Sequence, residues 1–262
     1  MTKTRSDSIH PTALVHVGAR LGENVSVGPY AVIEDDVIVG DGTSIAGHAV
    51  IKRYTRIGRE NRIYEHAVMG GDPQDVKFRN CVSYVSIGDG NLIREGVTIH
   101  RGSTAEAHTR IGNNCFLMAN CHIAHDCTLG DHVVIANGSL LGGVVSIGDR
   151  AFISGAVTIH QFCRVGRLAL LAASARINQD CLPFVITDGV PGRARSLNLI
   201  GLRRAQLPAA EIAGLKRAFQ TLRSATALEP ALAELDSSGS AAVAELVQFI
   251  RSSARGFAHI QR

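Results

Sequence analysis

The 262-residue sequence predicts a mainly β protein whose short parallel strands wind into a β-helix, followed by a C-terminal helical domain. Two patterns predict this architecture. An aliphatic residue or methionine recurs at every sixth position over most of residues 9–177, and apolar residues recur at helical spacing beyond residue 208. The composition, with 45% hydrophobic but only 5% aromatic residues, agrees with regular aliphatic layers.

A period of six requires a chain that turns a corner after every short strand, since a helix repeats every 3.6 residues and a strand every 2. We expect one apolar side chain per side to point inward and three sides to close a triangle, so that one coil takes eighteen residues. Coils then stack at the strand spacing of ~4.8 Å, because no coil buries its apolar face alone. The periodic positions are Ile9, Val15, Leu21, Val27, Ile33, Val39, Ile45, Ile51, Ile57, Ile63, Met69, Ile87, Ile93, Ile99, Ile111, Leu117, Ile123, Leu129, Ile135, Leu141, Ile147, Ile153, Ile159, Val165, Leu171 and Ile177.

Two polar stretches interrupt the repeat, at residues 70–86 and 101–110, and the pattern returns to its old phase after each. Both are therefore predicted to be loops that leave the β-helix at corners. Loops held by a rigid scaffold often carry functional residues. We assign residues 1–190 to the β-helix with these two loops.

Residues 191–262 are predicted to form the helical domain, since the repeat fades after Ile177 and Pro191 and Gly192 mark a boundary. One amphipathic helix is expected beyond Pro208 and a second over Ala241–Ile250. The apolar positions of the first are Ile212, Leu215, Phe219 and Leu222. The region is basic, and its cations form either a solvated helix face or a binding surface; they are Arg193, Arg195, Arg203, Arg204, Lys216 and Arg217.

Charge and composition narrow the environment of the protein. A formal net charge of +4 permits an anionic substrate or acidic partner, but is too small to indicate nucleic acid. No segment approaches the ~20 apolar residues of a membrane span. The polar start, Met1–Ser8, lacks the apolar core of a signal peptide, so we expect a cytoplasmic protein. The six cysteines form no C-x-x-C pair, and we expect buried or half-buried thiols rather than disulfides or a metal site.

The eighteen-residue coil converts sequence spacing into contacts. His125, Gly143, Gln161 and Gln179 are eighteen apart and should form one column on the outside of the prism. His160 sits beside Gln161, two coils from His125. The polar side chains that gather on this face are His122, His125, Asp126, His160 and Gln161.

This group of residues suits acyl transfer. His125 can act as a general base near neutral pH, and a carboxylate such as that of Asp126 could fix its tautomer. Gly143, one coil away, can present a backbone N–H to a developing oxyanion. Zinc binding is the competing use of such histidines, but His125 and His160 of one chain should lie too far apart to share an ion at ~2.0–2.1 Å.

The sequence resembles the acyl-carrier-protein-dependent UDP-N-acetylglucosamine 3-O-acyltransferases of lipid A biosynthesis. The likeness covers nearly the whole chain, including both loops and the tail. It rests on Gln74-Asp75-x-Lys77, Ile99-His100-Arg101-Gly102, His122-Ile123-Ala124-His125-Asp126-Cys127, His160-Gln161-Phe162, Gly201-Leu202-Arg203-Arg204 and Arg251-Ser252-Ser253-Ala254-Arg255-Gly256. The hexapeptide repeat alone is shared by many acyltransferases, whereas this combination is much more specific.

The resemblance implies a left-handed β-helix, against the usual right-handed crossover preference, and a homotrimer with active sites between subunits. It implies an O-acyltransferase that moves a (3-hydroxy)acyl group from acyl carrier protein to the sugar 3-hydroxyl, the first step of lipid A biosynthesis, with no resident cofactor or metal. It implies His125 as general base, Asp126 as its orienter and Gly143 as oxyanion donor. Substrate-binding positions are Asp75, Lys77, His122, His160, Gln161, Asn198 and Arg204, and Ala173 lies where the family tunes acyl-chain length.

Three positions depart from the family pattern at the periphery of the substrate site. Val144 stands where the family usually has a histidine, Ile200 where it often has a glutamate, and Ala205 where a second arginine commonly follows. These departures leave open a related acyltransferase acting on another acceptor, such as a 3-amino sugar nucleotide. Two further alternatives are a zinc-dependent hydratase on the same fold and a non-catalytic scaffold.

Overall fold

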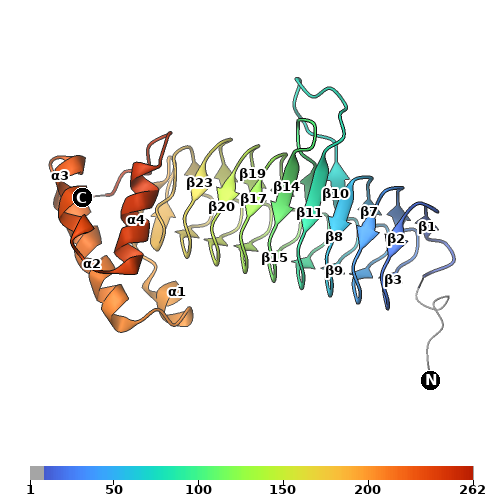
Figure 1. The fold of residues 1–262 in the computed structure, drawn as a ribbon, viewed down its shortest axis with the longest axis horizontal. Helices are drawn as coiled ribbons and strands as arrows, with labels where there is room; N and C mark the ends of the chain where they lie inside the picture. The colour runs from blue at the N-terminus through green and yellow to red at the C-terminus, as the bar shows by residue number, and fades with distance from the viewer. Residues whose placement is uncertain (1–8, 262) are drawn as a thin grey trace.

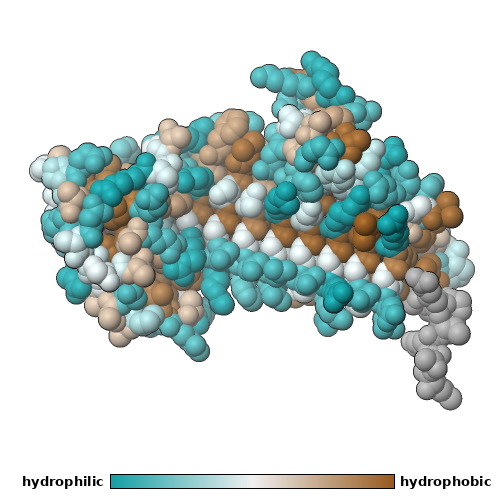
Figure 2. Space-filling view, in the orientation of Figure 1, coloured by the Kyte–Doolittle hydropathy of each residue, from teal (hydrophilic) through white to brown (hydrophobic). Residues whose placement is uncertain are grey.

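The computed structural model describes residues 9–261, which form an elongated three-sided prism with helices packed at its C-terminal end (Figure 1). The polar segment Met1–Ser8, in which the sequence shows no signal-peptide core, lies outside the described residues. In the space-filling view a hydrophobic band runs lengthwise along the prism between hydrophilic flanks (Figure 2). The molecule is the left-handed parallel β-helix with a C-terminal helical domain that we expected.

Three sheets form the sides of the prism, and the chain visits them in turn. Sheet 1 contains β1 (Leu14–Val15), β4 (Val32–Ile33), β7 (Val50–Ile51), β10 (Val68–Gly71), β13 (Thr98–His100), β16 (His122–Ile123), β19 (Leu140–Leu141), β22 (Thr158–Ile159) and β25 (Arg176–Ile177). Sheet 2 contains β2 (Arg20–Leu21), β5 (Ile38–Val39), β8 (Thr55–Ile57), β11 (Tyr84–Ile87), β14 (His108–Ile111), β17 (Thr128–Leu129), β20 (Ser146–Ile147) and β23 (Arg164–Val165). Sheet 3 contains β3 (Ser26–Val27), β6 (Ser44–Ile45), β9 (Arg62–Ile63), β12 (Leu92–Ile93), β15 (Phe116–Leu117), β18 (Val134–Ile135), β21 (Phe152–Ile153), β24 (Leu170–Leu171), β26 (Val185–Asp188) and the antiparallel β27 (Arg193–Leu197).

Up to Ile177 the predicted register of eighteen is confirmed wherever no loop intervenes, as in the parallel pairing of Ile123 with Leu141 and of Leu141 with Ile159. Beyond Ile177 the spacing shortens to sixteen, as in the pairing of Leu170 with Ile186. The first loop lies between β10 and β11 and the second between β13 and β14, and they project from the same edge of the prism (Figure 1). We call the edge between sheets 1 and 2 the first edge, that between sheets 2 and 3 the second edge, and that between sheet 3 and the next coil's sheet 1 the third edge.

Corner residues of the coils adopt left-handed backbone conformations at a spacing of six. Besides glycine and asparagine, the set includes His48 (φ 59), Val144 (φ 61) and Phe162 (φ 69). Such a conformation is unfavourable for residues with a side chain, and especially for a β-branched one. Hydrogen bonds to the coils above and below therefore hold the corner backbone in this conformation, which is why the coil tolerates many residue types there.

The core receives two side chains from each side of a coil, not the single one that we expected. From Val27 to Ile177 the residue two places before each periodic position is also buried, as Ala31 is before Ile33. This second position accepts small residues of mixed chemistry, among them Asn61 and Asn91, which hydrogen bond to each other inside the prism. The cysteines at this position are Cys115, Cys121, Cys127 and Cys163, whereas Cys181 lies beyond the repeat and pairs with Val165. These five are buried, Cys81 is half-buried, and all six thiols are free.

Within the described part of the chain, four helices cover the end of the prism: α1 (Leu199–Arg204), α2 (Ala209–Ser224), α3 (Leu228–Asp236) and α4 (Ala241–Arg251). The sequence predicted α2 and α4, whereas α1 and α3 were missed. They share a second core with the last coils, and ion pairs such as Arg167–Glu245 (2.7 Å) join the two parts. Among the described residues no helix combines the length and apolar character needed to cross a bilayer. The division at residue 190 stays a prediction, since the β26–β27 hairpin spans it.

We predict that the inward-facing periodic residues contribute most of the free energy of unfolding. Ile51→Ala, at a fully buried position, should lower the free energy of unfolding by about 2–5 kcal/mol, because it leaves a cavity between stacked coils. The matched control is Ile38→Ala, where the side chain is 37% exposed and less than half of that loss is expected. Denaturant titration measures both, and equal losses would contradict the assignment of inward and outward positions.

Candidate active site

His125 and Asp126 form a hydrogen-bonded pair at the first edge, directly after β16. His125 Nδ1 donates to Asp126 Oδ2 at 2.7 Å, and the two side chains are 8% and 18% exposed. Asp126 occupies a left-handed corner (φ 60), which turns its carboxylate back toward the preceding residue's ring. With the proton on Nδ1, the Nε2 of His125 keeps its lone pair and can accept a proton.

Gly143 lies against the reactive side of this ring. It follows β19, one coil beyond His125, and the two corners are joined by the hydrogen bond from Val144 N to His125 O (2.9 Å). A Cβ atom built on Gly143 would lie 2.5 Å from His125 Nε2, far inside van der Waals contact. Only glycine therefore leaves space for the imidazole in this position, and its backbone runs beside Nε2.

The Gly143 N–H donates to no acceptor among residues 9–261. At the second edge the equivalent amides are capped by side chains, as in Asn113 N to Asp131 Oδ1 (2.7 Å) and Asp131 N to Asp149 Oδ1 (2.9 Å). The first edge thus presents an unpaired donor next to an unpaired ring nitrogen. This is a suitable arrangement for stabilising an oxyanion beside a general base.

Two further imidazoles extend the site along sheet 1. His122 Nδ1 lies 2.7 Å from Thr98 Oγ1. The His122 ring packs edge-on against that of His100, with the ring centroids 4.8 Å apart. Burial, and then the proximity of His122, lower the pKa of His100 to about 4, and burial and His125 lower the pKa of His122. His100 was not assigned to the site from the sequence, although it stands in the Ile99-His100-Arg101-Gly102 segment that carried the resemblance.

His160 and Gln161 lie farther along the first edge, as the column argument predicted. Phe162 N donates to Gly143 O at 3.0 Å, which joins the His160 corner to that of Gly143. The exposed His160 ring contacts Arg255 from the C-terminal tail, with Nη2 3.4 Å from Nδ1. The tail therefore closes this end of the site.

Asp75 and Lys77 belong to the first loop, which projects over the same edge (Figure 1). The Lys77 backbone N–H donates to Asp75 Oδ1 at 2.9 Å. Arg101, only 4% exposed, anchors the loop by an ion pair with Asp72 (3.0 Å) and a cation–π contact with Phe78 (4.9 Å). Arg101 thus anchors the loop at the first edge, where it leaves the prism after β10.

Asn198 and Arg204 lie elsewhere in the same chain, at the second edge. Asn198 caps α1 by accepting from Gly201 N (3.0 Å) and also donates to Leu168 O (3.0 Å). Arg204, Arg150 and apolar residues of sheet 3 line a pocket beside it. The exposed Ala173 lies at the third edge. One chain therefore does not bring the predicted site residues together: those near His125 share an edge, while Asn198, Arg204 and Ala173 face other directions.

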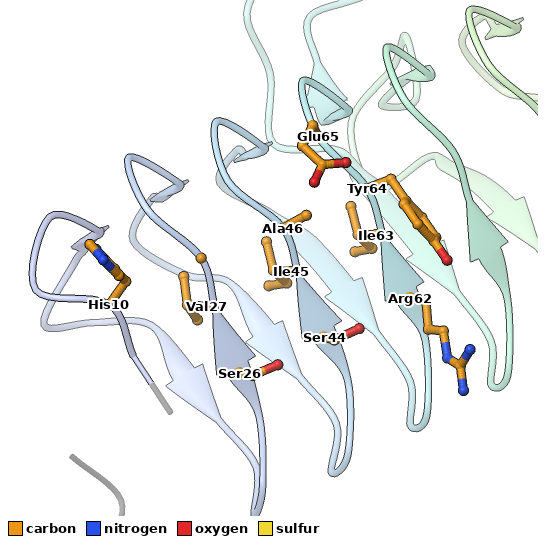
Figure 3. A pocket seen from close by; sticks show the side chains of 11 residues that line it. His10, Ser26, Val27, Ser44, Ile45, Ala46, Arg62, Ile63, Tyr64 and Glu65 are labelled. Atoms are coloured by element: carbon orange, nitrogen blue, oxygen red, sulfur yellow. The ribbon is translucent and has the colours of Figure 1, made fainter. Parts of the chain in front are cut away.

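A shallow pocket on sheet 3 near the N-terminal end is separate from this site. Ser26, Ser44 and Arg62 point outward along neighbouring strands there, with His10 and Glu65 at its borders (Figure 3). It contains none of the site residues predicted from the sequence. Within residues 9–261, no three histidine, cysteine, aspartate or glutamate side chains lie close enough to hold one metal ion.

Comparison with known proteins shows what this chain is similar to. Residues 180–258 match the family model described as UDP-N-acetylglucosamine O-acyltransferase, domain 2, and residues 18–53 and 108–143 match the bacterial transferase hexapeptide model. An acyl-[acyl-carrier-protein]–UDP-N-acetylglucosamine O-acyltransferase of Halorhodospira halophila is 46% identical over 95% of this chain and 98% of its own length. A relative with the same description from Gloeothece citriformis is also 46% identical, and there the match spans 65% of this chain and 62% of the relative.

Solved structures give the same result for the fold. The UDP-N-acetylglucosamine acyltransferase of Bacteroides fragilis superposes with a TM-score of 0.92 at 37% identity, covering 97% of this chain and 99% of that one. The enzyme of the same description from Campylobacter jejuni superposes with a TM-score of 0.91 at 38% identity, covering 97% and 100%. The likeness thus includes the β-helix, both loops and the helical end.

The low pKa of His100 makes a prediction about stability. Between pH 6.5, the ordinary histidine pKa, and about pH 4, His100 is protonated in the unfolded chain but neutral in the folded protein. The free energy of unfolding of the wild type therefore falls as the pH is lowered through this window. His100→Gln cannot titrate, and its destabilisation relative to wild type should shrink as the pH falls from 7 to 4. Denaturant titrations at several pH values test this, with the exposed His16→Gln as control. A pH-independent difference would contradict it.

Proposed function

Since the chain belongs to the UDP-N-acetylglucosamine O-acyltransferase family, we propose that it transfers an acyl group from acyl carrier protein to the 3-hydroxyl of UDP-N-acetylglucosamine, with His125 as general base. The observation that carries the proposal is the placement of the His125 ring between the Asp126 carboxylate and the Gly143 backbone. Those three groups supply the base, its orientation and an oxyanion donor.

The proposed reaction gives each of these three groups a role. His125 Nε2 takes the proton of the sugar 3-hydroxyl while its oxygen attacks the thioester carbonyl carbon. The Gly143 N–H stabilises the negative oxygen of the tetrahedral intermediate, and Asp126 stabilises the imidazolium. The intermediate then collapses: the carbon–sulfur bond breaks, the carrier protein's thiolate leaves and takes the proton from His125, and an ester remains on the sugar.

The remaining first-edge residues form the sugar side of the proposed site. His122, His160 and Gln161 lie along sheet 1 on either side of His125, and Asp75 and Lys77 overhang it from the first loop. With a pKa lowered by burial, His122 is neutral near pH 7 and can accept or donate a hydrogen bond without adding charge.

Arg204 is suited to the diphosphate, since its guanidinium is permanently charged and can form paired hydrogen bonds. Asn198 supports it by capping α1, the helix that carries Arg204, and its amide keeps one N–H free for substrate. Because these residues lie at the second edge and His125 at the first, a complete site requires two chains. We therefore propose a homotrimer in which each site combines the first edge of one subunit with sheet 3 and α1 of its neighbour.

Apolar side chains on both proposed halves of the site suit an acyl chain. Val144 and Phe162 are 40% and 50% exposed beside Gly143, and Phe152 and Leu170 line the pocket near Arg204. Ala173 follows Leu170 on the next corner, and its small side chain leaves space for a longer acyl chain.

The six unpaired cysteines agree with action in the reducing cytoplasm. The acyl carrier protein is a co-substrate, and the proposed chemistry requires no bound cofactor.

We predict that purified protein acylates UDP-N-acetylglucosamine when supplied with excess acyl-carrier-protein thioesters, as detected by mass spectrometry. His125→Ala should slow the reaction by about 10²–10⁴-fold, the usual contribution of a general base. The control is His16→Ala, an exposed histidine at the far end of the prism, which should retain activity.

The acceptor is tested in the same experiment. Ile200, 65% exposed on α1, and Val144 stand where the family usually carries polar side chains, so the panel includes a 3-amino sugar nucleotide. If only the 3-amino sugar nucleotide gives product, the acceptor group of the reaction is an amine and not the 3-hydroxyl. No product from any pair, or equal rates for wild type and His125→Ala, would contradict the proposal.

Shared sites predict complementation between inactive variants. In mixed trimers of His125→Ala and Arg204→Ala subunits, about a quarter of the sites should combine an intact His125 with a neighbour's intact Arg204. Activity at low sugar-nucleotide concentration should then exceed that of either variant. Mixtures of His125→Ala with Asp126→Ala, which alter the same edge, should gain nothing. Equal behaviour of the two mixtures would contradict a site built from two chains.

A further inference from the structure

We propose that Ser103, in the second loop, is a positioning residue that holds the Asp126 carboxylate against His125. Its hydroxyl donates to Asp126 Oδ2 at 2.6 Å, and its backbone N–H lies 3.1 Å from Oδ1 and 3.2 Å from Oδ2. This inference rests on the proposed function, because it assigns a role in orienting the proposed general base.

The two donors meet on one carboxylate oxygen. Oδ2 of Asp126 accepts from Ser103 Oγ at 2.6 Å and from His125 Nδ1 at 2.7 Å, and both bonds are charge-assisted. The Asp126 backbone is fixed from another direction, since its N–H donates to Thr109 Oγ1 at 2.8 Å. Thr109 fixes the backbone and Ser103 the carboxylate, so the pair leaves Asp126 little freedom to rotate away from the ring.

Ser103 is itself held by contacts between the two loops. The preceding Gly102 accepts a hydrogen bond from Ser83 Oγ at 2.5 Å, and Ser83 in turn accepts from the buried Arg101 at 3.1 Å. Glu106 N donates to Val82 O at 2.9 Å, which joins the loops a second time. The second loop therefore connects the first loop to the catalytic pair through Ser103.

The chemical consequence is specific to the charged state of His125. When Nε2 takes a proton, the imidazolium is stabilised by a carboxylate held at hydrogen-bond distance from Nδ1. Loss of the Ser103 hydroxyl removes the shortest bond to the carboxylate and leaves only the longer backbone N–H contacts, so the carboxylate is held less firmly and stabilises the imidazolium less. The effect should fall on kcat and on the protonation of the base rather than on sugar-nucleotide binding, since Ser103 lies behind Asp126 relative to the reacting nitrogen.

Ser103→Ala tests this directly. We expect kcat to fall about 10–100-fold with KM for the sugar nucleotide changed less than about twofold. The acid limb of the kcat/KM profile should move to lower pH, because a less stabilised imidazolium loses its proton more easily. Ser103→Thr keeps the hydroxyl and should restore both the rate and the limb, whereas Ser103→Cys, a weaker donor, should lie between.

A matched control and a double variant separate positioning from folding. Ser86→Ala also removes a serine side-chain hydrogen bond, the one between Ser86 Oγ and His108 Nδ1 (2.8 Å), but outside the site. This variant should leave the pH profile unchanged. In an Asp126→Asn background the further change Ser103→Ala should have little additional effect on kcat, since the carboxylate that it positions is gone. Additive losses, or an unmoved acid limb in active Ser103→Ala, would overturn the inference. Inactivity of the wild type would instead overturn the proposed function.

Discussion

Every coil of this molecule up to Ile177 must take eighteen residues unless the extra chain leaves at a corner. Inward side chains at two positions per side, and left-handed corner residues every six, enforce that count, because a slip by one residue would turn the core side chains outward. Insertions are tolerated only as loops, and after each loop the chain returns to the column that it left.

The site inherits its geometry from this constraint. The first loop leaves the first edge two coils before the His125 corner and the second loop one coil before it, so both stand over the same edge as His125. The rigid stack sets the distance between His125 and Gly143, and glycine at that corner admits the ring. The loops then add two features that a regular repeat cannot supply. Arg101 anchors the first loop over the edge, and Ser103 of the second loop holds the carboxylate of Asp126.

The sequence predicted those features that follow from spacing. The column of His125, Gly143 and Gln161 is a consequence of the coil length, and so is the burial of cysteines six apart. The contact between His125 and Asp126 does not follow from spacing, because adjacent side chains in extended chain point apart and only the left-handed corner at Asp126 turns these two together. Ser103 was missed because loop conformations have no period, and α3 because Pro230 in its first turn hides a short helical pattern.

The central claim is that the first edge of one subunit and the second edge of its neighbour together bind the sugar nucleotide at His125. A crystal structure of the assembled protein with UDP-N-acetylglucosamine bound tests it most directly. The account predicts the sugar 3-hydroxyl oxygen ~2.6–3.2 Å from His125 Nε2, with the diphosphate at Arg204 of the adjacent subunit. A sugar nucleotide bound within one chain, or with no acceptor group facing Nε2, would contradict it.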